Sequence, residues 1–133
     1  EVLRFFRDQC ASLPDEVMLL AALQTAPDGA KVAGIVGSHC GSLEAGEAAF
    51  RPLKAFGPPV MDALGPIPYA TLNGMIDGAF PKGALNYWKA QFLTDLSDDA
   101  IRARVAGFET CPSPMSAIAR GRMRLSTNTV DSS

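Results

Sequence analysis

Several features that would place this chain in a specialised class are missing from its sequence. No apolar run approaches the roughly 18 residues that a membrane-spanning helix needs, and the first residues lack the basic start and apolar centre of a signal peptide. We therefore expect a soluble, cytoplasmic protein with no membrane partner. The chain carries 12 Lys and Arg against 14 Asp and Glu, a net charge of −2. The basic residues are scattered, which argues against a nucleic-acid partner.

Cysteine and histidine are scarce. Cys10, Cys40 and Cys111 are an odd number with long, unequal spacings, which favours reduced, buried thiols over a disulfide framework. His39 is the only histidine and precedes Cys40, but neighbouring residues of a strand point to opposite faces and no second ligand pair exists. We therefore expect no metal site.

Patterns for phosphate binding and for carboxylate catalysis are also absent. Gly34, Gly37 and Gly41 lack the spacing of a dinucleotide-binding loop, and no Gly-Lys-Ser/Thr motif follows a strand. Asp98 and Asp99 are adjacent acids, but they stand in the expected first turn of a helix, where the helix dipole explains them. We therefore assign no catalytic residue.

The chain does contain enough apolar material for one globular domain. Hydrophobic residues make up 47% of the sequence and charged residues 20%, which is ordinary for a globular protein. The slight apolar excess predicts some hydrophobic surface that meets another protein surface. We expect residues 1–119 to form one domain, and residues 120–133, which are basic and then rich in Ser and Thr, to form a frayed or disordered tail.

Hydrophobic periodicity predicts the order of the elements. Apolar residues at helical spacing predict a helix that Pro14 ends. The apolar run 16–26 suits either a central strand or a buried helix, but a second run over 32–40 makes a hairpin across residues 27–30 the better interpretation. The later elements are a helix capped by Ser42 with a buried stripe of Leu43, Phe50 and Leu53, an extended piece with a helical turn near residues 72–77, a strand over 84–93, a helix from Ser97 with a stripe of Ile101, Val105 and Phe108, and an edge strand over 115–119. This order predicts an α+β fold, an antiparallel β-sheet with helices packed on one face in ferredoxin-like layering.

The stretch from Gly83 to Leu93 holds the only Trp and one of two Tyr. Read as a strand, it places Leu85, Tyr87, Lys89 and Gln91 on one face and Asn86, Trp88, Ala90 and Phe92 on the other. A Lys between aromatic residues is too costly to bury without a partner, so it either reaches water or faces a wet cavity. The expected strand is therefore the predicted wall of a binding site.

Six residues form the predicted substrate-binding set: Tyr69, Tyr87, Trp88, Lys89, Gln24 and His39. The aromatic members combine ring area with polar tips, as small-molecule sites do, although ordinary sheet packing explains each of them taken alone. Gln24 and His39 lie on the predicted hairpin, where the sequence leaves open which face of the sheet each occupies.

Short motifs follow one another in a definite order along most of residues 2–116. They are Pro27-Asp28-Gly29, Gly41 before an acidic helix, Pro52-Leu53, Phe56-Gly57, Gly65-Pro66-Ile67-Pro68-Tyr69, Gly83, Asn86-Tyr87-Trp88-Lys89, Phe92-Leu93 and Leu96-Ser97-Asp98. This succession resembles the FAD-linked oxidases of the berberine-bridge-enzyme-like group. In that family the matching region is the substrate-binding domain, an antiparallel sheet backed by helices whose open face lies over the flavin held by a separate domain.

The resemblance implies the substrate-binding, or cap, domain of an FAD-dependent oxidoreductase, with a small-molecule substrate and a flavin-binding domain as partners. No segment matches the family's FAD-binding loops, so we expect no cofactor in this chain and no activity from the chain alone. From Arg120 onward the sequence departs from the glycine-rich strand of the family. The start without Met suggests a piece of a longer protein, and the sheet face left bare predicts a homodimer in isolation.

A second hypothesis is a free-standing α+β module, descended from such a domain, that binds a small ligand or a protein. A natural reading frame that starts near Glu1 and ends at Ser133 would favour this module over an oxidase domain. A third hypothesis, an independent enzyme without flavin, has only Tyr69, Tyr87 and Lys89 as candidate functional side chains and ranks last.

Overall fold

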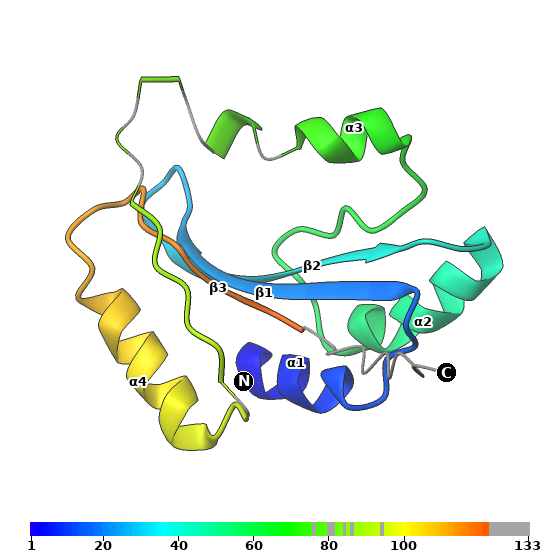
Figure 1. Ribbon diagram of the computed structural model, residues 1–133, viewed down its shortest axis with the longest axis horizontal. Coiled ribbons are helices and arrows are strands. Elements are labelled where there is room, and N and C mark those ends of the chain that lie inside the picture. Colours follow the sequence, from blue (N-terminus) through cyan, green and yellow to red (C-terminus); the bar gives the residue numbers. More distant parts are fainter. Residues whose placement is uncertain (76, 80–81, 84, 86, 94, 123–133) are drawn as a thin grey trace, which may run out of the picture.

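The chain folds as a three-stranded antiparallel sheet with helices against one face (Figure 1). The computed structural model describes residues 1–75, 77–79, 82–83, 85, 87–93 and 95–122. In chain order the elements are α1 (Val2–Cys10), β1 (Val17–Thr25), β2 (Lys31–His39), α2 (Leu43–Ala55), α3 (Tyr69–Gly74), the 3-10 turn η1 (Asp77–Ala79), α4 (Asp98–Glu109) and β3 (Ile118–Gly121). The predicted α+β class, with a helix-backed antiparallel sheet, is confirmed.

The hairpin of β1 and β2 forms as predicted, around a turn whose residues suit it. Gly29 has a φ of 87°, a left-handed conformation that glycine adopts without strain. The Asp28 carboxylate accepts a hydrogen bond from the Ala30 N–H at 3.0 Å, and the Ala26 N–H donates to the Ala30 carbonyl at 2.8 Å. The turn thereby sets a register in which Val17 faces His39 and Thr25 faces Lys31.

β1 is the central strand, and its backbone groups alternate between its two neighbours. The Cys40 N–H donates to the Glu16 carbonyl at 3.0 Å, so the backbone groups of the even-numbered residues of β1 form hydrogen bonds with β2. The Arg122 N–H donates to the Leu19 carbonyl at 3.2 Å, which assigns odd-numbered residues to β3. The sheet order is therefore β2-β1-β3.

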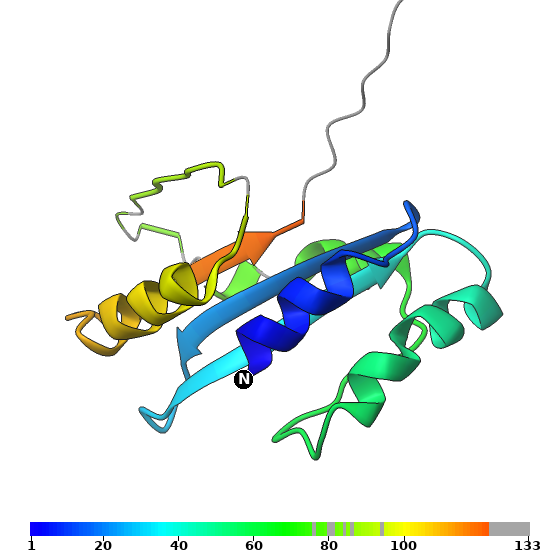
Figure 2. The same cartoon turned by 90° about the horizontal axis from the view of Figure 1, so that it is seen from below.

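The core lies between β1 and the two helices α1 and α4, which lie across the same face of the sheet (Figure 2). Alternate side chains of β1 point into it: Val17, Leu19, Ala21 and Leu23. The helices and their flanking segments contribute Leu3, Phe6, Leu13, Leu96, Ile101 and Phe108. Leu19 has no exposed surface, so it marks the centre of the core.

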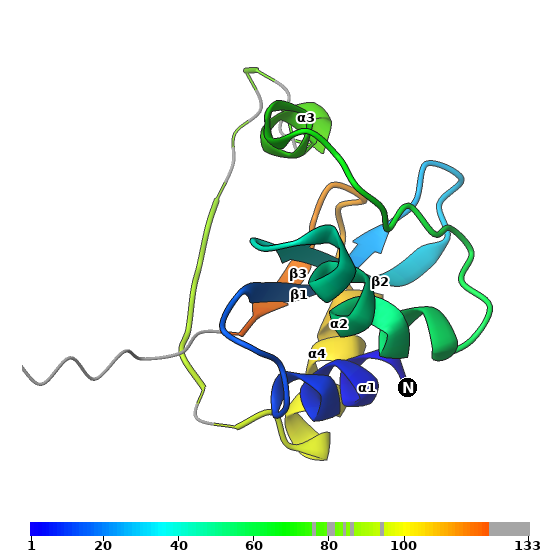
Figure 3. The same cartoon turned by 90° about the vertical axis from the view of Figure 1, so that its right-hand side faces the viewer.

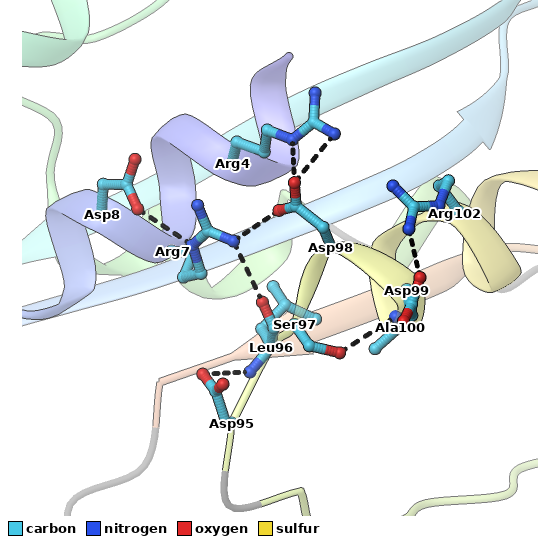
Figure 4. A network of polar contacts seen from close by, with 10 residues as sticks. All are labelled: Arg4, Arg7, Asp8, Asp95, Leu96, Ser97, Asp98, Asp99, Ala100 and Arg102. Carbon is cyan, nitrogen blue, oxygen red and sulfur yellow. Dashed lines mark hydrogen bonds and ion pairs between the residues drawn. The ribbon is translucent and has the colours of Figure 1, made fainter.

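A group of charged side chains joins α1 to the start of α4 (Figure 4). The carboxylate of Asp98 accepts hydrogen bonds from Arg7 at 2.7 Å and from Arg4 at 3.2 Å. These contacts lower the pKa of Asp98, with the hydrogen bond from Arg7 as the largest cause. Ser97 caps α4 as predicted, because its hydroxyl accepts a hydrogen bond from the Ala100 N–H at 3.2 Å.

At the other end of α4, Lys31 of the hairpin holds the helix terminus. Its ammonium group donates to the carbonyls of Phe108 and Glu109 at 2.6 and 3.0 Å, and lies 4.6 Å from the centre of the Phe108 ring. A cation at this position complements the negative end of the helix dipole. The hairpin and α4 are thus joined by a polar contact as well as by the core.

α2 begins at the predicted cap and packs beside β2. The Ser42 hydroxyl accepts a hydrogen bond from the Ala45 N–H at 3.2 Å. Phe50 and Leu53 pack against the core as expected, but Leu43 is exposed because it precedes the part of the helix that reaches the sheet. Phe56, just after α2, stacks on Phe5 of α1 with 4.0 Å between ring centroids.

The strand predicted over residues 84–93 is wrong, since the described residues in this range form no strand. Both edges of β1 are already occupied by β2 and β3, so strand propensity alone gives this segment no place beside the central strand. It passes beside β3, where Arg120 donates a hydrogen bond to the Leu93 carbonyl at 3.3 Å. Ala84 and Asn86 lie outside the described residues.

Two other boundaries differ from the prediction. α3 starts at Tyr69, directly after Pro68, and ends at Gly74, so the helical turn comes earlier than the expected residues 72–77. β3 spans Ile118–Gly121 and so continues two residues into the predicted tail, because Arg120 and Gly121 pair with β1. The rest of that tail, residues 123–133, lies outside the described residues.

Candidate functional site

The sheet face opposite α1 and α4 is apolar and is the candidate binding surface, here called the open face. Its residues are Met18, Leu20, Ala22 and Gln24 of β1, Val32, Gly34, Val36 and Ser38 of β2, and Ala119 and Gly121 of β3. α3 lies on this side of the sheet (Figure 3), but it contains no buried residue. Met18 and Val36 are 51% and 46% exposed, so the face is only partly covered by the described residues.

The composition of β1 shows why this face stands out. Every residue from Val17 to Leu23 is apolar, a pattern typical of strands that are covered on both faces. Helices cover only one of its faces here, and Met18 remains half exposed on the other. The strand therefore has the composition of one that contacts a second protein surface on the open face.

The chemistry of the open face is that of a binding surface. Among its ten strand positions, Gln24 and Ser38 carry the only hydrogen-bonding side chains, and none is charged. Such a surface offers apolar contact and two hydrogen-bonding groups to a ligand. It provides no acid, base or nucleophile that would carry out a reaction by itself.

The aromatic residues predicted from sequence lie outside the sheet. Tyr69 begins α3, whereas Tyr87, Trp88 and Lys89 precede Leu93, the residue of their segment whose carbonyl accepts a hydrogen bond from Arg120 of β3. The three aromatic side chains are 73–88% exposed, and Lys89 is exposed as well. Aromatic walls of a completed pocket are largely buried, so these residues would line one only after another surface closed over them.

Gln24 and His39 occupy opposite faces of the sheet. Gln24 points to the open face, while His39, paired with Val17, lies on the helix side. The His39 ring fits against two glycines at the start of α2: a Cβ atom at Gly41 would lie 2.5 Å from its Cε1 atom, and one at Gly46 3.4 Å from its Cγ atom. His39 therefore packs the hairpin against α2, and the structure does not bring it to the other predicted site residues.

The surface has a smaller and a larger hollow, and neither contains the predicted site residues. One, of about 150 Å³, lies between α1, α4 and the hairpin, and the other, of about 350 Å³, lies between α1, β3 and residues 93–96. None of the six predicted residues lines either hollow. FAD is usually held by a glycine-rich loop at a helix N-terminus, but Ser42 and Ser97 cap the N-termini of α2 and α4. At these two helices a serine hydroxyl already accepts a hydrogen bond from one of the N–H groups that would face a phosphate.

Other findings concern metals and membranes. Across the described residues, no three His, Cys, Asp or Glu side chains are grouped so that they would hold a metal ion. Within the same residues, no helix has the length and apolar character needed to cross a membrane.

Sequence reasoning expected a bare sheet face but assigned it to the strand predicted over residues 84–93, and so missed that β1 and β2 form most of it. The signal was present, because residues 17–23 are apolar at both alternating sets of positions, but the sequence does not tell which set the helices cover. Comparison with known proteins adds no assignment: no family model, curated protein or solved structure matches this chain.

Proposed function

We propose that this chain is the substrate-binding domain of an FAD-linked oxidase of the berberine-bridge-enzyme-like group, acting in the cytoplasm. In such an enzyme the flavin supplies the redox chemistry, and the substrate domain binds and orients the small molecule. The order of motifs between Pro27 and Asp98 is the sequence support for this proposal.

The observation that carries the proposal is the open face. A helix-backed sheet with an apolar, half-exposed second face is the surface that a substrate domain would turn toward a flavin domain. The exposure of Tyr69, Tyr87 and Trp88 supports it too, because these side chains would become pocket walls once that partner surface was in place. Lys89 would then supply a cationic group at the rim.

Cofactor retention tests the proposal directly. The purified chain is mixed with excess FAD, desalted, and its absorbance is recorded in the visible region. We expect no retained flavin, because the proposal places the FAD site in another domain. A stable yellow complex would refute the assignment of this chain as the substrate domain alone.

A free-standing binding module is the second candidate. The observation in its favour is that the described residues enclose a core of ten buried hydrophobic side chains without help from another domain. Sequencing the native transcript separates the two candidates. A reading frame that continues into a flavin-binding region favours the oxidase domain, and a frame bounded by Glu1 and Ser133 favours the module.

A further inference from the structure

The larger hollow is lined by charged residues that have no part in the proposed function. It is a groove of about 350 Å³ on the helix side of the sheet, and the only residue it shares with the ten strand positions of the open face is Gly121, which has no side chain. Its lining includes Cys10, Ala11, Leu93, Asp95, Arg120 and Arg122. This volume is at the lower end of the range for small-molecule sites, roughly 300–1,000 Å³.

Two arginines give the groove a positive charge. Arg120 and Arg122 form no ion pair with any carboxylate in the described residues. Each donates a hydrogen bond to a backbone carbonyl, Arg120 to Leu93 and Arg122 to Pro14, both at 3.3 Å. A guanidinium has five N–H donors, so each keeps several for a ligand.

The other charged groups of the groove cancel only part of this charge. Arg7 is already neutralised by Asp8 and Asp98, to which it lies at 2.9 and 2.7 Å. Asp95 is the single acid in the lining, and one of its oxygens accepts a hydrogen bond from the Leu96 N–H at 2.7 Å (Figure 4). The groove is therefore locally positive in a chain whose net charge is −2.

The groove also contains apolar residues and the thiol of Cys10. Phe6 and Leu96 are 2% and 4% exposed, so the apolar surface of the groove comes from the more exposed Leu93 and Ala11. Burial raises the pKa of the Cys10 thiol, while the charges of Arg122 and Arg120 act in the opposite direction. Cys10 and both arginines line the same groove, so an anion held there would lie near all three side chains.

We propose that this groove binds a small organic carboxylate, whose charged end pairs with Arg120 and Arg122 and whose apolar body rests on Leu93 and Ala11. Planar guanidinium groups match the two oxygens of a carboxylate. These apolar residues favour an organic acid over an inorganic anion, because phosphate would leave Leu93 and Ala11 without apolar contact. The site lies on the opposite face from the surface of the proposed function, so either proposal stands or fails without the other.

Cys10 provides a built-in probe of the site. In alkylation the thiolate forms an S–C bond while the C–I bond breaks and iodide leaves, so the negative reagent iodoacetate can be compared with neutral iodoacetamide. Peptide mass mapping gives the rate ratio at Cys10, and the exposed Cys40 serves as the reference in the same sample. We expect the ratio of iodoacetate to iodoacetamide rates to be roughly fivefold higher at Cys10, through attraction by two nearby cations.

Variants and competitors make the test specific. Arg120→Gln with Arg122→Gln keeps a donor for each carbonyl and should reduce the Cys10 ratio to that of Cys40, whereas Arg51→Gln, on the exposed surface of α2, should leave it unchanged. With the unaltered chain, benzoate should slow alkylation of Cys10 by iodoacetamide, and benzamide should not. Equal ratios at Cys10 and Cys40 would overturn the proposal. So would protection by benzamide or inorganic phosphate that equals protection by benzoate.

Discussion

At the scale of single residues, Asp98 joins two helices through charge. It accepts hydrogen bonds from Arg7 and Arg4 of α1 while it occupies the first turn of α4. These contacts lower its pKa below the ordinary value of 3.8. A carboxylate whose pKa is lower in the folded state stabilises the fold above its unfolded pKa, and this contribution is lost as pH falls through the folded pKa.

We therefore predict that Asp98→Asn lowers the melting temperature at pH 7 and that the difference from the unaltered chain shrinks below about pH 4. Thermal unfolding followed by circular dichroism between pH 2.5 and 7 measures it. Asp99→Asn is the matched control, because Asp99 pairs only with the exposed Arg102 within its own helix. An equal effect of the two substitutions at every pH would contradict the prediction.

A second residue-scale prediction concerns Gly37 of β2. A Cβ atom there would lie 2.7 Å from Cε1 of Phe50 and 3.1 Å from Cδ1 of Leu19, so one of these side chains would have to move. We expect Gly37→Ala to destabilise the protein by about 1–2 kcal/mol in urea unfolding. Gly34→Ala, where no atom lies within 4 Å, should be neutral or slightly stabilising.

The role of Phe50 in this effect can be separated. In a Phe50→Ala background the space beside Gly37 opens, so Gly37→Ala should cost clearly less than in the unaltered chain. Additive costs of the two substitutions would show that the ring does not limit the site.

At the scale of elements, the two faces of β1 contribute differently to the free energy of unfolding. Leu19 is fully buried beneath the helices, whereas its neighbour Met18 is half exposed on the open face. We predict that Leu19→Ala destabilises the protein by roughly 2–5 kcal/mol through lost burial and a cavity. Met18→Ala should cost less than about 1 kcal/mol. Urea unfolding of both variants measures this, and similar costs would mean that the open face is covered in solution.

The elements that sequence predicts well are those fixed by local chemistry. Asp28 and Gly29 specify the hairpin turn, and Ser42 and Ser97 specify helix starts, because each acts through a hydrogen bond or dihedral angle of its own neighbourhood. The apolar stripe of α4 also identified its buried side, since Ile101 and Phe108 both reach the core.

The elements that sequence predicts poorly are those decided by competition for a partner. Residues 87–93 have strand-like composition, yet Ile118–Gly121 pairs with β1 instead. For the same reason the predicted site residues do not come together. The sequence predicts Tyr87 and Lys89 on a strand of the sheet, whereas the described residues of their segment form no strand. Neither the open face nor the convergence of Cys10 with two arginines follows from spacing, because both arise from strand pairing between distant segments.

At the scale of the whole molecule, an apolar face that is half exposed in water favours association. We propose a homodimer of this chain in isolation, paired through the open face about a two-fold axis. A specific dimer would bury on the order of 1,200 Å² or more in total. Light scattering on a dilution series should give twice the chain mass at tens of micromolar.

Two variants locate the contact. Met18→Lys combined with Val36→Lys places charges on the open face and should give monomers, while Trp88→Lys, on the segment beside β3, should leave the dimer intact. A single-chain mass for the unaltered protein would refute the dimer, and dissociation only by Trp88→Lys would move the contact to that segment.

The position of β3 near the far end of the described chain also governs when the sheet is completed during synthesis. β1 ends at Thr25 and β3 begins at Ile118, roughly ninety residues later. A ribosome adds about 5–20 residues per second, so the β3-facing edge of β1 waits on the order of ten seconds for its partner. The hairpin itself forms within microseconds once its residues emerge. Until β3 emerges, the β3-facing edge of β1 therefore lacks the strand that pairs with it in the folded structure, and chaperones that bind extended segments have this interval in which to protect it.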